Sequence, residues 1–390
     1  MYFLNDKKDC CGCSACLNIC PKNCIKMKVD EEGFHYPYIY DEKICIECKL
    51  CEKTCPILNN EDDNKIPEAY ACKNINDDIR KESSSGGVFT LLSEFILNDN
   101  GIVFGGMFDE EFDVIHGSVD SKEKLYKLRG SKYSQSDMND CYKRIRGELN
   151  KNRLVLFSGT PCQVGGLHKF LKRKYDNLYT IDVACHGVPS PTVFKKYKSF
   201  LEKKHNSKIE NFTFRSKEEG WTNYKLRAEF KNGQVFSEYG YENTYMKGFI
   251  KDLYIRPSCT DCKFKNFTSG SDIMLADYWG YDTKFKEFDN NTGVSLVFTN
   301  SNKGKELFKS IQKDIKVEKT EVKHATQYNP CIIKSVSKHK KSKRFYKNID
   351  SMDFNSLVLE CIKERKETKI EYYFRAIINV IKIKLGYNME

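Results

Sequence analysis

Cysteines at short, repeated spacings are the residues of this sequence with the clearest capacity for chemistry. The chain has 390 residues and 18 cysteines. The stretch "CCGCSACLNICP" (10–21) carries one string of the form C-x2-C-x2-C-x3-C-P, and "CIECKLCEKTCP" (45–56) repeats it 35 positions later. The repeat indicates an internal duplication. Its cysteines are Cys10, Cys13, Cys16 and Cys20 in the first copy, and Cys45, Cys48, Cys51 and Cys55 in the second.

This spacing is typical of [4Fe–4S] clusters. Three closely spaced thiolates surround three corners of an iron–sulfur cubane, and the fourth reaches the neighbouring cluster. The alternative is a pair of zinc sites, which usually space their cysteines as two separated pairs. Residues 5–58 resemble the two-cluster ferredoxin domain of bacteria. The first cluster is therefore expected on Cys10, Cys13, Cys16 and Cys55, and the second on Cys45, Cys48, Cys51 and Cys20.

Two cysteines near the N-terminus lie outside this register. Cys11 and Cys24 are expected to be small, buried and unreactive side chains. The stretch "NNEDDNKIP" (59–67) that follows the repeat is acidic and nearly free of apolar residues. It predicts a linker between two domains.

Beyond residue 68, apolar runs of strand period and helix period alternate, which predicts a mixed or mostly parallel sheet covered by helices. Alternating apolar and polar residues between 208 and 240 predict antiparallel strands added to that core. Strands are expected at 68–74, 101–108, 153–159 and 178–185, helices at 86–97, 162–174 and 190–204, and a strand, a turn and a helix over 293–311. The predicted fold class is α+β: a small ferredoxin-like two-cluster domain (1–58), a linker (59–67), a larger α/β domain with a mixed sheet (68–330) and a basic, helical C-terminal tail (331–390).

Several junctions between these strands and helices carry residues suited to binding an anion. "KESSSGGVF" (81–89) places hydroxyls and glycines directly before a helix, where unpaired amides favour phosphate. Capping of the helix alone is the simpler alternative. Further motifs are "RGSKYSQS" (129–136), "FSGTPCQVGGL" (157–167), "DVACHGVPSP" (182–191), "RPSCTDCKF" (256–264) and "SDIMLADYWG" (271–280).

Taken in order, six motifs resemble the beta subunits of coenzyme F420 hydrogenases and dehydrogenases: S-S-G-G, R-G-S-K-Y, G-T-P-C-Q-V, C-H-G-V-P-S, C-x2-C and D-Y-W-G. With the ferredoxin domain, the resemblance covers about residues 5–300. It implies a flavoprotein with FAD and iron–sulfur clusters that passes electrons between a hydride carrier and one-electron partners. The family also includes reductases that use reduced ferredoxin without the deazaflavin.

Four cysteines of these motifs form the set that one further cubane needs. We hypothesise a third [4Fe–4S] cluster on Cys162, Cys185, Cys259 and Cys262, next to the flavin. A zinc site on the same four thiolates is one alternative. Another is a redox-active Cys259–Cys262 pair with unrelated core cysteines elsewhere.

The same junctions supply the candidate flavin site. Ser85, Gly86 and Gly87 are the candidates for the pyrophosphate. The ring or ribityl chain is expected beside Gly159, Thr160, Ser131, Lys132 and Tyr133.

Two of the motif residues are candidates for catalysis. Lys132 is expected to tune the flavin, because a nearby cation stabilises the reduced anionic ring; a solvated surface lysine is the alternative. His186 is a candidate proton donor, although a histidine at a strand end more often caps a loop. Asp277 is a candidate hydrogen-bonding anchor, and Tyr278 and Trp279 are expected to pack.

The charge and the termini set further expectations. The formal charge of +11 comes from 65 Lys and Arg against 54 Asp and Glu, so the surface is mixed. Metal-bound thiolates lower the excess of positive charge. The positive charge that remains suits acidic redox partners. No nucleic-acid partner is expected. Without an apolar leader, a cysteine-rich chain is expected to be cytoplasmic.

Two C-terminal stretches have more than one interpretation. The basic stretch at 334–350 is a patch for acidic partners or a solvated helix face. The apolar stretch at 370–385 predicts a helix that docks on this chain or a partner subunit, with peripheral membrane contact as the weaker alternative.

These features predict an anaerobic, oxygen-sensitive iron–sulfur flavoprotein oxidoreductase. FAD would exchange two electrons with a hydride carrier or substrate, and [4Fe–4S] clusters would relay single electrons to or from a ferredoxin-like partner. Three alternatives remain: a non-catalytic electron-transfer subunit of a larger redox complex, a ferredoxin-dependent reductase that does not use F420, and a nucleic-acid-binding metalloprotein.

Overall fold

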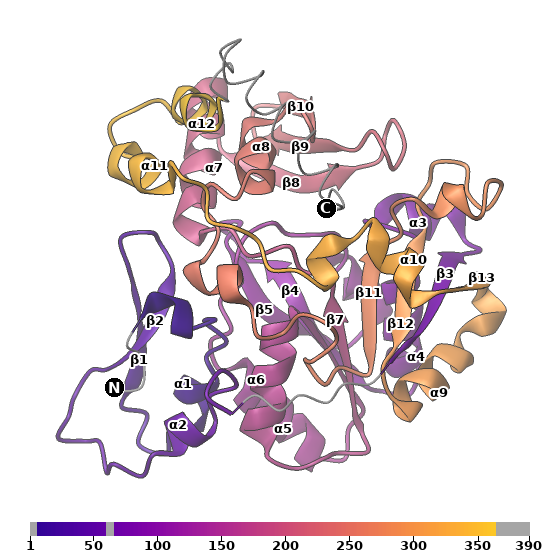
Figure 1. The fold of residues 1–390 in the computed structure, drawn as a ribbon, viewed down its shortest axis with the longest axis horizontal. Coiled ribbons are helices and arrows are strands. Elements are labelled where there is room, and N and C mark those ends of the chain that lie inside the picture. The colour runs from indigo at the N-terminus through magenta and orange to yellow at the C-terminus, as the bar shows by residue number, and fades with distance from the viewer. Residues whose placement is uncertain (1–5, 60–65, 364–390) are drawn as a thin grey trace, which may run out of the picture.

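An eight-stranded mixed sheet forms the centre of the molecule. The computed structural model describes residues 6–59 and 66–363 (Figure 1). The strand order is β13-β3-β12-β11-β7-β6-β4-β5. The strands are β3 (Glu68–Asn74), β4 (Ile102–Phe108), β5 (Val114–Val119), β6 (Val155–Gly159), β7 (Leu178–Val183), β11 (Ile273–Asp277), β12 (Ser295–Thr299) and β13 (Ile315–Thr320).

The strand directions decide where a ligand can bind. The neighbours β4, β6, β7 and β11 are mutually parallel. β12 is antiparallel to both β11 and β3, so β3 runs in the same direction as β11. The carboxyl ends of these five strands therefore meet at one edge of the sheet, which is the usual ligand-binding edge of an α/β domain.

Helices cover both faces of the sheet, as the sequence predicts. Alternate residues of β4 face opposite ways: Ile102 and Phe104 pack on one helix pair, and Val103 packs on the other. One pair is α5 (Cys141–Asn150) and α6 (Pro161–Leu171), and the other is α4 (Val88–Asn98) and α9 (Asn302–Ser310). The two short helices α3 (Asp77–Glu82) and α10 (Val322–Gln327) lie near β3 (Figure 1).

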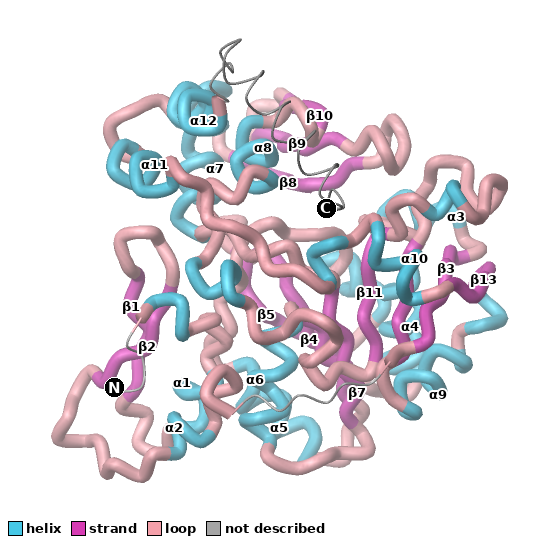
Figure 2. The backbone as a smooth tube through the Cα atoms, viewed as in Figure 1, coloured by secondary structure: helices cyan, strands magenta, loops and turns pink. Residues whose placement is uncertain are grey.

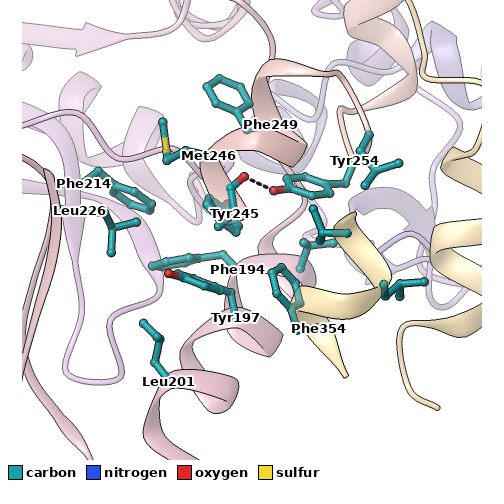
Figure 3. Close-up of a cluster of buried hydrophobic side chains, with 14 of the residues drawn as sticks. Phe194, Tyr197, Leu201, Phe214, Leu226, Tyr245, Met246, Phe249, Tyr254 and Phe354 are labelled. Carbon is teal, nitrogen blue, oxygen red and sulfur yellow. Dashed lines mark hydrogen bonds between the residues drawn. The ribbon is translucent and has the colours of Figure 1, made fainter. Parts of the chain in front are cut away.

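The strands predicted between 208 and 240 form an antiparallel sheet of their own, so the expectation that they add to the core of the central sheet is wrong. β8 (Ile209–Ser216), β9 (Lys225–Phe230) and β10 (Val235–Tyr239) pair in the order β10-β9-β8. The reason is a separate core, in which the apolar face of this sheet packs on α7 (Pro191–His205) and α8 (Thr244–Ile250). Figure 3 shows this core, where Phe194 and Tyr197 of α7 lie near Tyr245 of α8.

The N-terminal unit is small and packs beside the sheet. It contains the β1 (Ile25–Val29) and β2 (His35–Ile39) hairpin and the short helices α1 (Ala15–Ile19) and α2 (Leu50–Lys53). α1 contacts α5 and α6 (Figure 2). Gly166 of α6 makes the contact possible, because a Cβ there would lie 2.9 Å from both Cys13 Sγ and Tyr142 Oη.

The described part of the C-terminal segment packs on the separate core of α7, α8 and the β8–β10 sheet, hereafter the second core. α11 (Ser342–Asn348) and α12 (Phe354–Ile362) lie beside α7 and α8 (Figure 1). Phe345 and Leu357 are fully buried there, so this segment is not a solvated face alone. The predicted helix at 370–385 and most of the predicted linker lie outside the described residues. No helix within 6–59 or 66–363 has the length and apolar character needed to cross a membrane.

Candidate functional site

A cavity of about 820 Å³ lies at the edge where the carboxyl ends of the strands meet. Its volume falls within the usual range of cofactor and ligand pockets. The residues that line it include the turn after α3, the segment 130–134 and the ends of β6, β7 and β11. Of the predicted flavin and catalytic residues it brings together Ser85, Gly87, Ser131, Lys132, Tyr133, Gly159, Thr160 and His186.

Gly86 is the one predicted flavin residue that does not line this cavity. Its N–H donates to Ser295 Oγ at 2.9 Å. A Cβ at this position would lie 2.5 Å from the Cys72 carbonyl oxygen. Gly86 therefore allows close packing against β3 and β12. Gly87, whose φ is +81°, is the N-cap residue of α4 and lines the cavity.

Lys132 is held at the cavity without a carboxylate partner among the described residues. Its Nζ donates to the carbonyl oxygens of Arg129 at 2.8 Å and Gly130 at 3.1 Å. Burial lowers its pKa to about 7. A lysine in this state gains from an incoming negative charge, and it is not the solvated surface lysine of the alternative interpretation.

A hydrogen-bonded chain fixes the wall beside Gly159 and Thr160. Gln163 Oε1 accepts from the Thr160 N–H at 2.8 Å, and Gln163 Nε2 donates to Ser136 Oγ at 2.9 Å. Ser136 Oγ is 2.8 Å from His116 Nδ1, and His116 Nε2 is 3.1 Å from the Ser158 carbonyl oxygen. Because a carbonyl only accepts, Nε2 carries the proton and Nδ1 accepts from Ser136.

Sequence reasoning missed His116. It lies within β5, a strand of mixed polarity, and no motif marks it. Burial lowers its pKa to about 4, so the ring is neutral at neutral pH. Its place in the chain of hydrogen bonds makes it a positioning residue for the cavity wall.

His186 and Asp252 form a pair at the same cavity. His186 Nε2 lies 2.7 Å from Asp252 Oδ1, and the ring packs edge-on against Phe249. A histidine oriented by a carboxylate can donate a proton from its other nitrogen. Asp252 is thus a partner of His186 that the sequence did not identify, and the role of His186 as a proton donor stays a prediction.

Asp277, the predicted anchor, pairs with a residue that no motif contained. Its Oδ2 accepts from Arg215 of β8, and its Oδ1 lies 3.3 Å from Trp221 Nε1. Trp221 stacks on Trp279 with ring centroids 4.5 Å apart and planes 3° apart. Trp279 lines the cavity, whereas Tyr278 is fully buried and packs as predicted.

A second, small cavity is lined by cysteines from five separate parts of the chain. Cys162 stands in the first turn of α6, and a hydrogen bond with Cys11, together with burial, raises the pKa of its thiol well above the usual value. Cys185 follows β7, and Cys259 and Cys262 lie at the short helix η3 (Pro257–Asp261). The six cysteines that line the cavity are Cys11, Cys162, Cys185, Cys259, Cys262 and Cys331.

The four predicted ligands of the third cluster affect one another electrostatically. Burial raises the pKa of Cys185 well above its usual value, and Cys259, Cys162 and Cys262 raise it further. Burial likewise raises the pKa of Cys259 to about 12, with contributions from Cys162 and Cys262. The four thiols thus lie around one buried space, and this donor set fits a [4Fe–4S] cluster.

The two cavities share a wall. Residues 184–188 and Cys331 line both of them. Cys185 and His186 in this segment therefore separate the cysteine-lined cavity from the large one by the thickness of a single stretch of chain.

The first ferredoxin set is also gathered as the spacing predicts. Burial raises the pKa of Cys16 well above its usual value, and Cys10 and Cys55 raise it further. Cys55 and Cys16 also raise the pKa of the buried Cys13. The fourth cysteine of the second string therefore lies with the first string.

The second set is less compact. Cys20, Cys45 and Cys51 pack in one small apolar group, while Cys48 is exposed. Cys24, outside the register, lies 3.5 Å from Cys20, sulfur to sulfur, and is buried as expected. Within the described ranges no three His, Cys, Asp or Glu side chains have the spacing of a single-ion site.

Cys11 lies between the two groups of cysteines. A hydrogen bond with Cys13 is the main reason that its pKa lies well above the usual value, and a second hydrogen bond joins it to Cys162. It is buried, as the sequence predicts. Its position makes the first ferredoxin set and the third set neighbours.

Arg256 fixes this junction, although this first residue of the motif at 256–264 received no predicted role. The side chain is fully buried. Its Nε donates to the Cys10 carbonyl oxygen at 2.8 Å, Nη1 to Gln135 Oε1 at 2.9 Å and Nη2 to the His35 carbonyl oxygen at 3.0 Å. Since η3 and Cys259 follow it directly, one guanidinium joins the ferredoxin unit to the third cysteine set.

Family models match two parts of the chain. Residues 9–58 match the 4Fe-4S dicluster domain. Residues 152–325 match the C terminus of the beta subunit of coenzyme F420 hydrogenase/dehydrogenase. These matches confirm the resemblance stated from the motifs. They support iron–sulfur clusters as cofactors and a relation to an oxidoreductase subunit.

Individual relatives are similar over shorter lengths. An uncharacterized ferredoxin of Methanocaldococcus jannaschii is 39% identical over 51 residues, which is 13% of this chain and 64% of the relative. An uncharacterized protein of the same organism is 25% identical over 210 residues (44% and 56%). A 7Fe ferredoxin of Hydrogenibacillus schlegelii is 30% identical over 57 residues (15% and 65%). The chain thus spans less than two thirds of each of these relatives.

A solved structure is also similar. A chain of the F420-reducing [NiFe] hydrogenase complex from Methanosarcina barkeri aligns at 19% identity with a TM-score of 0.44. The alignment covers 77% of this chain and 94% of that chain.

Proposed function

We propose that this chain is an iron–sulfur flavoprotein oxidoreductase. It carries a 4Fe-4S dicluster domain and a region related to F420 hydrogenase beta subunits. It would pass electrons between one-electron partners and a hydride carrier or substrate. When bound, FAD supplies two-electron chemistry and each [4Fe–4S] cluster supplies one-electron transfer. The observation that carries the proposal is the wall shared by the cysteine-lined cavity and the large cavity.

The cysteine sets follow one another toward that wall, which supports this function. The second ferredoxin set adjoins the first, because Cys51 contributes to the raised pKa of Cys16. The first set adjoins the third through Cys11, and the third borders the large cavity at Cys185. Three sets in series would place the ferredoxin unit (1–58) as the entry for electrons from a ferredoxin-like partner or a partner subunit.

The large cavity has groups that suit a flavin dinucleotide. Ser85 and Gly87, at the start of α4, would hold the pyrophosphate, since the first amides of a helix attract anions. Lys132 would stand near the ring and stabilise negative charge there. His186, oriented by Asp252, would move a proton at its free ring nitrogen.

We also propose the division into a two-cluster domain (1–58), a linker (59–67), a flavin and iron–sulfur domain (68–330) and a C-terminal segment (331–390). Phe345 and Leu357 pack in the second core, which supports folding of residues 331–363 together with the third part. A reducing, cytoplasmic setting suits the unpaired cysteines.

Anaerobic purification of the full chain, followed by flavin extraction, tests the proposal. We expect bound FAD and a visible spectrum with flavin and iron–sulfur absorbance. Reduction should then be compared with reduced deazaflavin, NADH, NADPH and reduced ferredoxin as donors. Turnover with a dye acceptor would separate an enzyme from a passive electron-transfer subunit, and a chain without flavin would refute the proposal.

A further inference from the structure

Arg215 is a buried cation of the large cavity whose hydrogen bonds are incomplete. Its side chain is 3% exposed and lines the cavity at the end of β8. Its Nη1 donates to Asp277 Oδ2. Its Nε and Nη2 have no hydrogen-bond partner among the described residues. Buried donors are usually paired, so unpaired ones mark a place where a further group binds.

The two unpaired nitrogens form one complete edge of the guanidinium. Nε and Nη2 lie side by side in its plane, and together they present two parallel N–H bonds. Asp277 holds the opposite nitrogen and thereby fixes the plane. Such an edge matches the two oxygens of a carboxylate or phosphate, which is the bidentate contact that a lysine cannot make.

Lys217, two residues further along the chain, cannot take this role. Its Nζ donates to the carbonyl oxygens of Arg80 at 2.9 Å, Ser85 at 2.7 Å and Thr292 at 2.7 Å. Three acceptors use all three of its protons. Lys217 therefore has no free donor, whereas Arg215 has two donors without a partner among the described residues.

Aromatic rings surround the Arg215 guanidinium. Its Cζ lies 4.7 Å from the Tyr224 ring centroid and 5.7 Å from that of Trp279. Trp279 in turn stacks on Trp221. These rings shield the guanidinium from water, which strengthens an ionic contact made there.

We propose that the Nε–Nη2 edge of Arg215 binds a carboxylate or phosphate group of a molecule in the large cavity. Two sources share this chemistry, namely the pyrophosphate of the flavin dinucleotide and an acidic group on the hydride carrier or substrate. The choice of sources rests on the proposed function, whereas the anion site itself does not require a flavin.

The protein contains its own reporter of this site. Its two tryptophans are Trp221 and Trp279, and both lie beside the Asp277–Arg215 pair. We expect inorganic pyrophosphate to change the tryptophan fluorescence of the flavin-free, anaerobically prepared full chain in a saturable way. The same titration with FAD, and with riboflavin, which lacks phosphate, tests the flavin.

Three variants sharpen the test. Arg215→Lys keeps the charge but loses the two-donor edge, so we expect pyrophosphate to bind at least tenfold more weakly. Arg215→Gln with Asp277→Asn keeps a neutral hydrogen-bonded pair and protects folding from an unpaired buried carboxylate. Arg227→Lys is the matched control, because Arg227 of β9 pairs with Glu218 and Glu229 away from the cavity.

The outcomes separate the two sources. If Arg215→Lys weakens FAD but not riboflavin, the flavin pyrophosphate is the ligand. Citrate serves as the carboxylate probe for the other source. If Arg215→Lys leaves FAD affinity unchanged but, when loaded with FAD, binds citrate more weakly than the FAD-loaded wild type, the ligand is an acidic carrier or substrate. If Arg215→Lys binds pyrophosphate, FAD and citrate as tightly as the control Arg227→Lys does, the inference is overturned. A wild-type chain that binds pyrophosphate through Arg215 but no flavin would refute the proposed function and leave this inference standing.

Discussion

Two cations at the large cavity differ in how their charges are compensated. Arg215 has a carboxylate partner in Asp277, and that contact keeps its pKa above the usual value although burial works against it. Among the described residues the hydrogen-bond partners of Lys132 are backbone carbonyls, and burial lowers its pKa to about 7. Arg215 is therefore charged at every accessible pH, whereas the charge of Lys132 responds to what binds beside it.

This difference predicts that anion binding is linked to a proton at Lys132. An anionic ligand favours the charged form, so we expect FAD binding to take up protons near pH 7 and to weaken as the pH rises above 7. Lys132→Met should lose the proton uptake and bind FAD about 10- to 100-fold more weakly, the usual effect of losing one charge-assisted hydrogen bond. Calorimetry in buffers of different ionisation enthalpy measures both quantities.

The exposed Lys127, on the same segment, provides the control. Lys127→Met should match the wild type in affinity and in proton uptake. Equal proton uptake in Lys132→Met and in the wild type would contradict the assignment.

His116 predicts a pH dependence of stability. Its folded pKa is about 4, below the ordinary value of 6.5, so between these values the unfolded chain binds more protons than the folded one. Wild-type stability should fall by roughly 3 kcal/mol as the pH decreases from 6.5 to 4 through this one residue. The thermal midpoint of His116→Gln should show a shallower slope over that range, and equal slopes would refute the neutral buried histidine.

Cys11 tests the register of the first cysteine string. Although its thiol lies beside Cys13 and Cys162, it completes neither four-cysteine set. Cys11→Ala should therefore retain the iron content and the visible absorbance of the wild type, whereas Cys13→Ala should lose iron. Loss of about four iron ions in Cys11→Ala would show that the register is wrong.

At the scale of elements, the contact of the ferredoxin unit with α6 depends on a missing side chain. An alanine at position 166 would crowd Cys13 Sγ and Tyr142 Oη, each 2.9 Å from the added Cβ. We expect Gly166→Ala to destabilise the protein by about 1–3 kcal/mol, as overpacking usually does. Protease cleavage within residues 6–59 should become faster as the unit loosens.

Gly147 of α5 offers a matched control on the neighbouring helix. Apart from its chain neighbours and the backbone of its own helix, no atom lies within 4 Å of a Cβ added there. Gly147→Ala should stabilise the helix by roughly 0.5–1 kcal/mol, because alanine loses less backbone entropy than glycine. If both alanine variants raise the thermal midpoint, the close contact at Gly166 is not formed.

Local sequence patterns predicted the elements better than their assembly. The run "EAYACKN" matches β3 over Glu68–Asn74, because alternation and burial are properties of the segment itself. The runs between 208 and 240 are strands, but their sheet depends on a separate core with α7 and α8. Pairing partners are set by packing between distant segments, which no single stretch encodes.

The same limit applies to the site. Motif residues such as Ser85, Lys132 and Thr160 were found because each stands beside a recognisable junction. Arg215 stands in no motif, and Arg256 opens the motif at 256–264 without any local sign of its role. Each gains its role from a partner far away in the chain, at 277 and at 10 respectively. A single arginine in a strand or loop carries no local signal of such a contact.

At the scale of the whole molecule, the chain folds so that three cysteine sets and one large cavity lie in succession. The N-terminal unit packs on the α5–α6 side of the sheet, and Arg256 holds it against the third set. The third set borders the cavity along residues 184–188. This succession is what the proposed passage of electrons requires, and it depends on a cluster at the third set.

The iron and acid-labile sulfide content of the anaerobically prepared full chain tests that requirement most directly. Three four-cysteine sets predict about twelve iron ions and about twelve sulfides per chain. Cys259→Ser with Cys262→Ser should lower both numbers to about eight and leave the two ferredoxin clusters in place. A wild-type content of about eight, unchanged in that double variant, would contradict a third cluster between the ferredoxin unit and the large cavity.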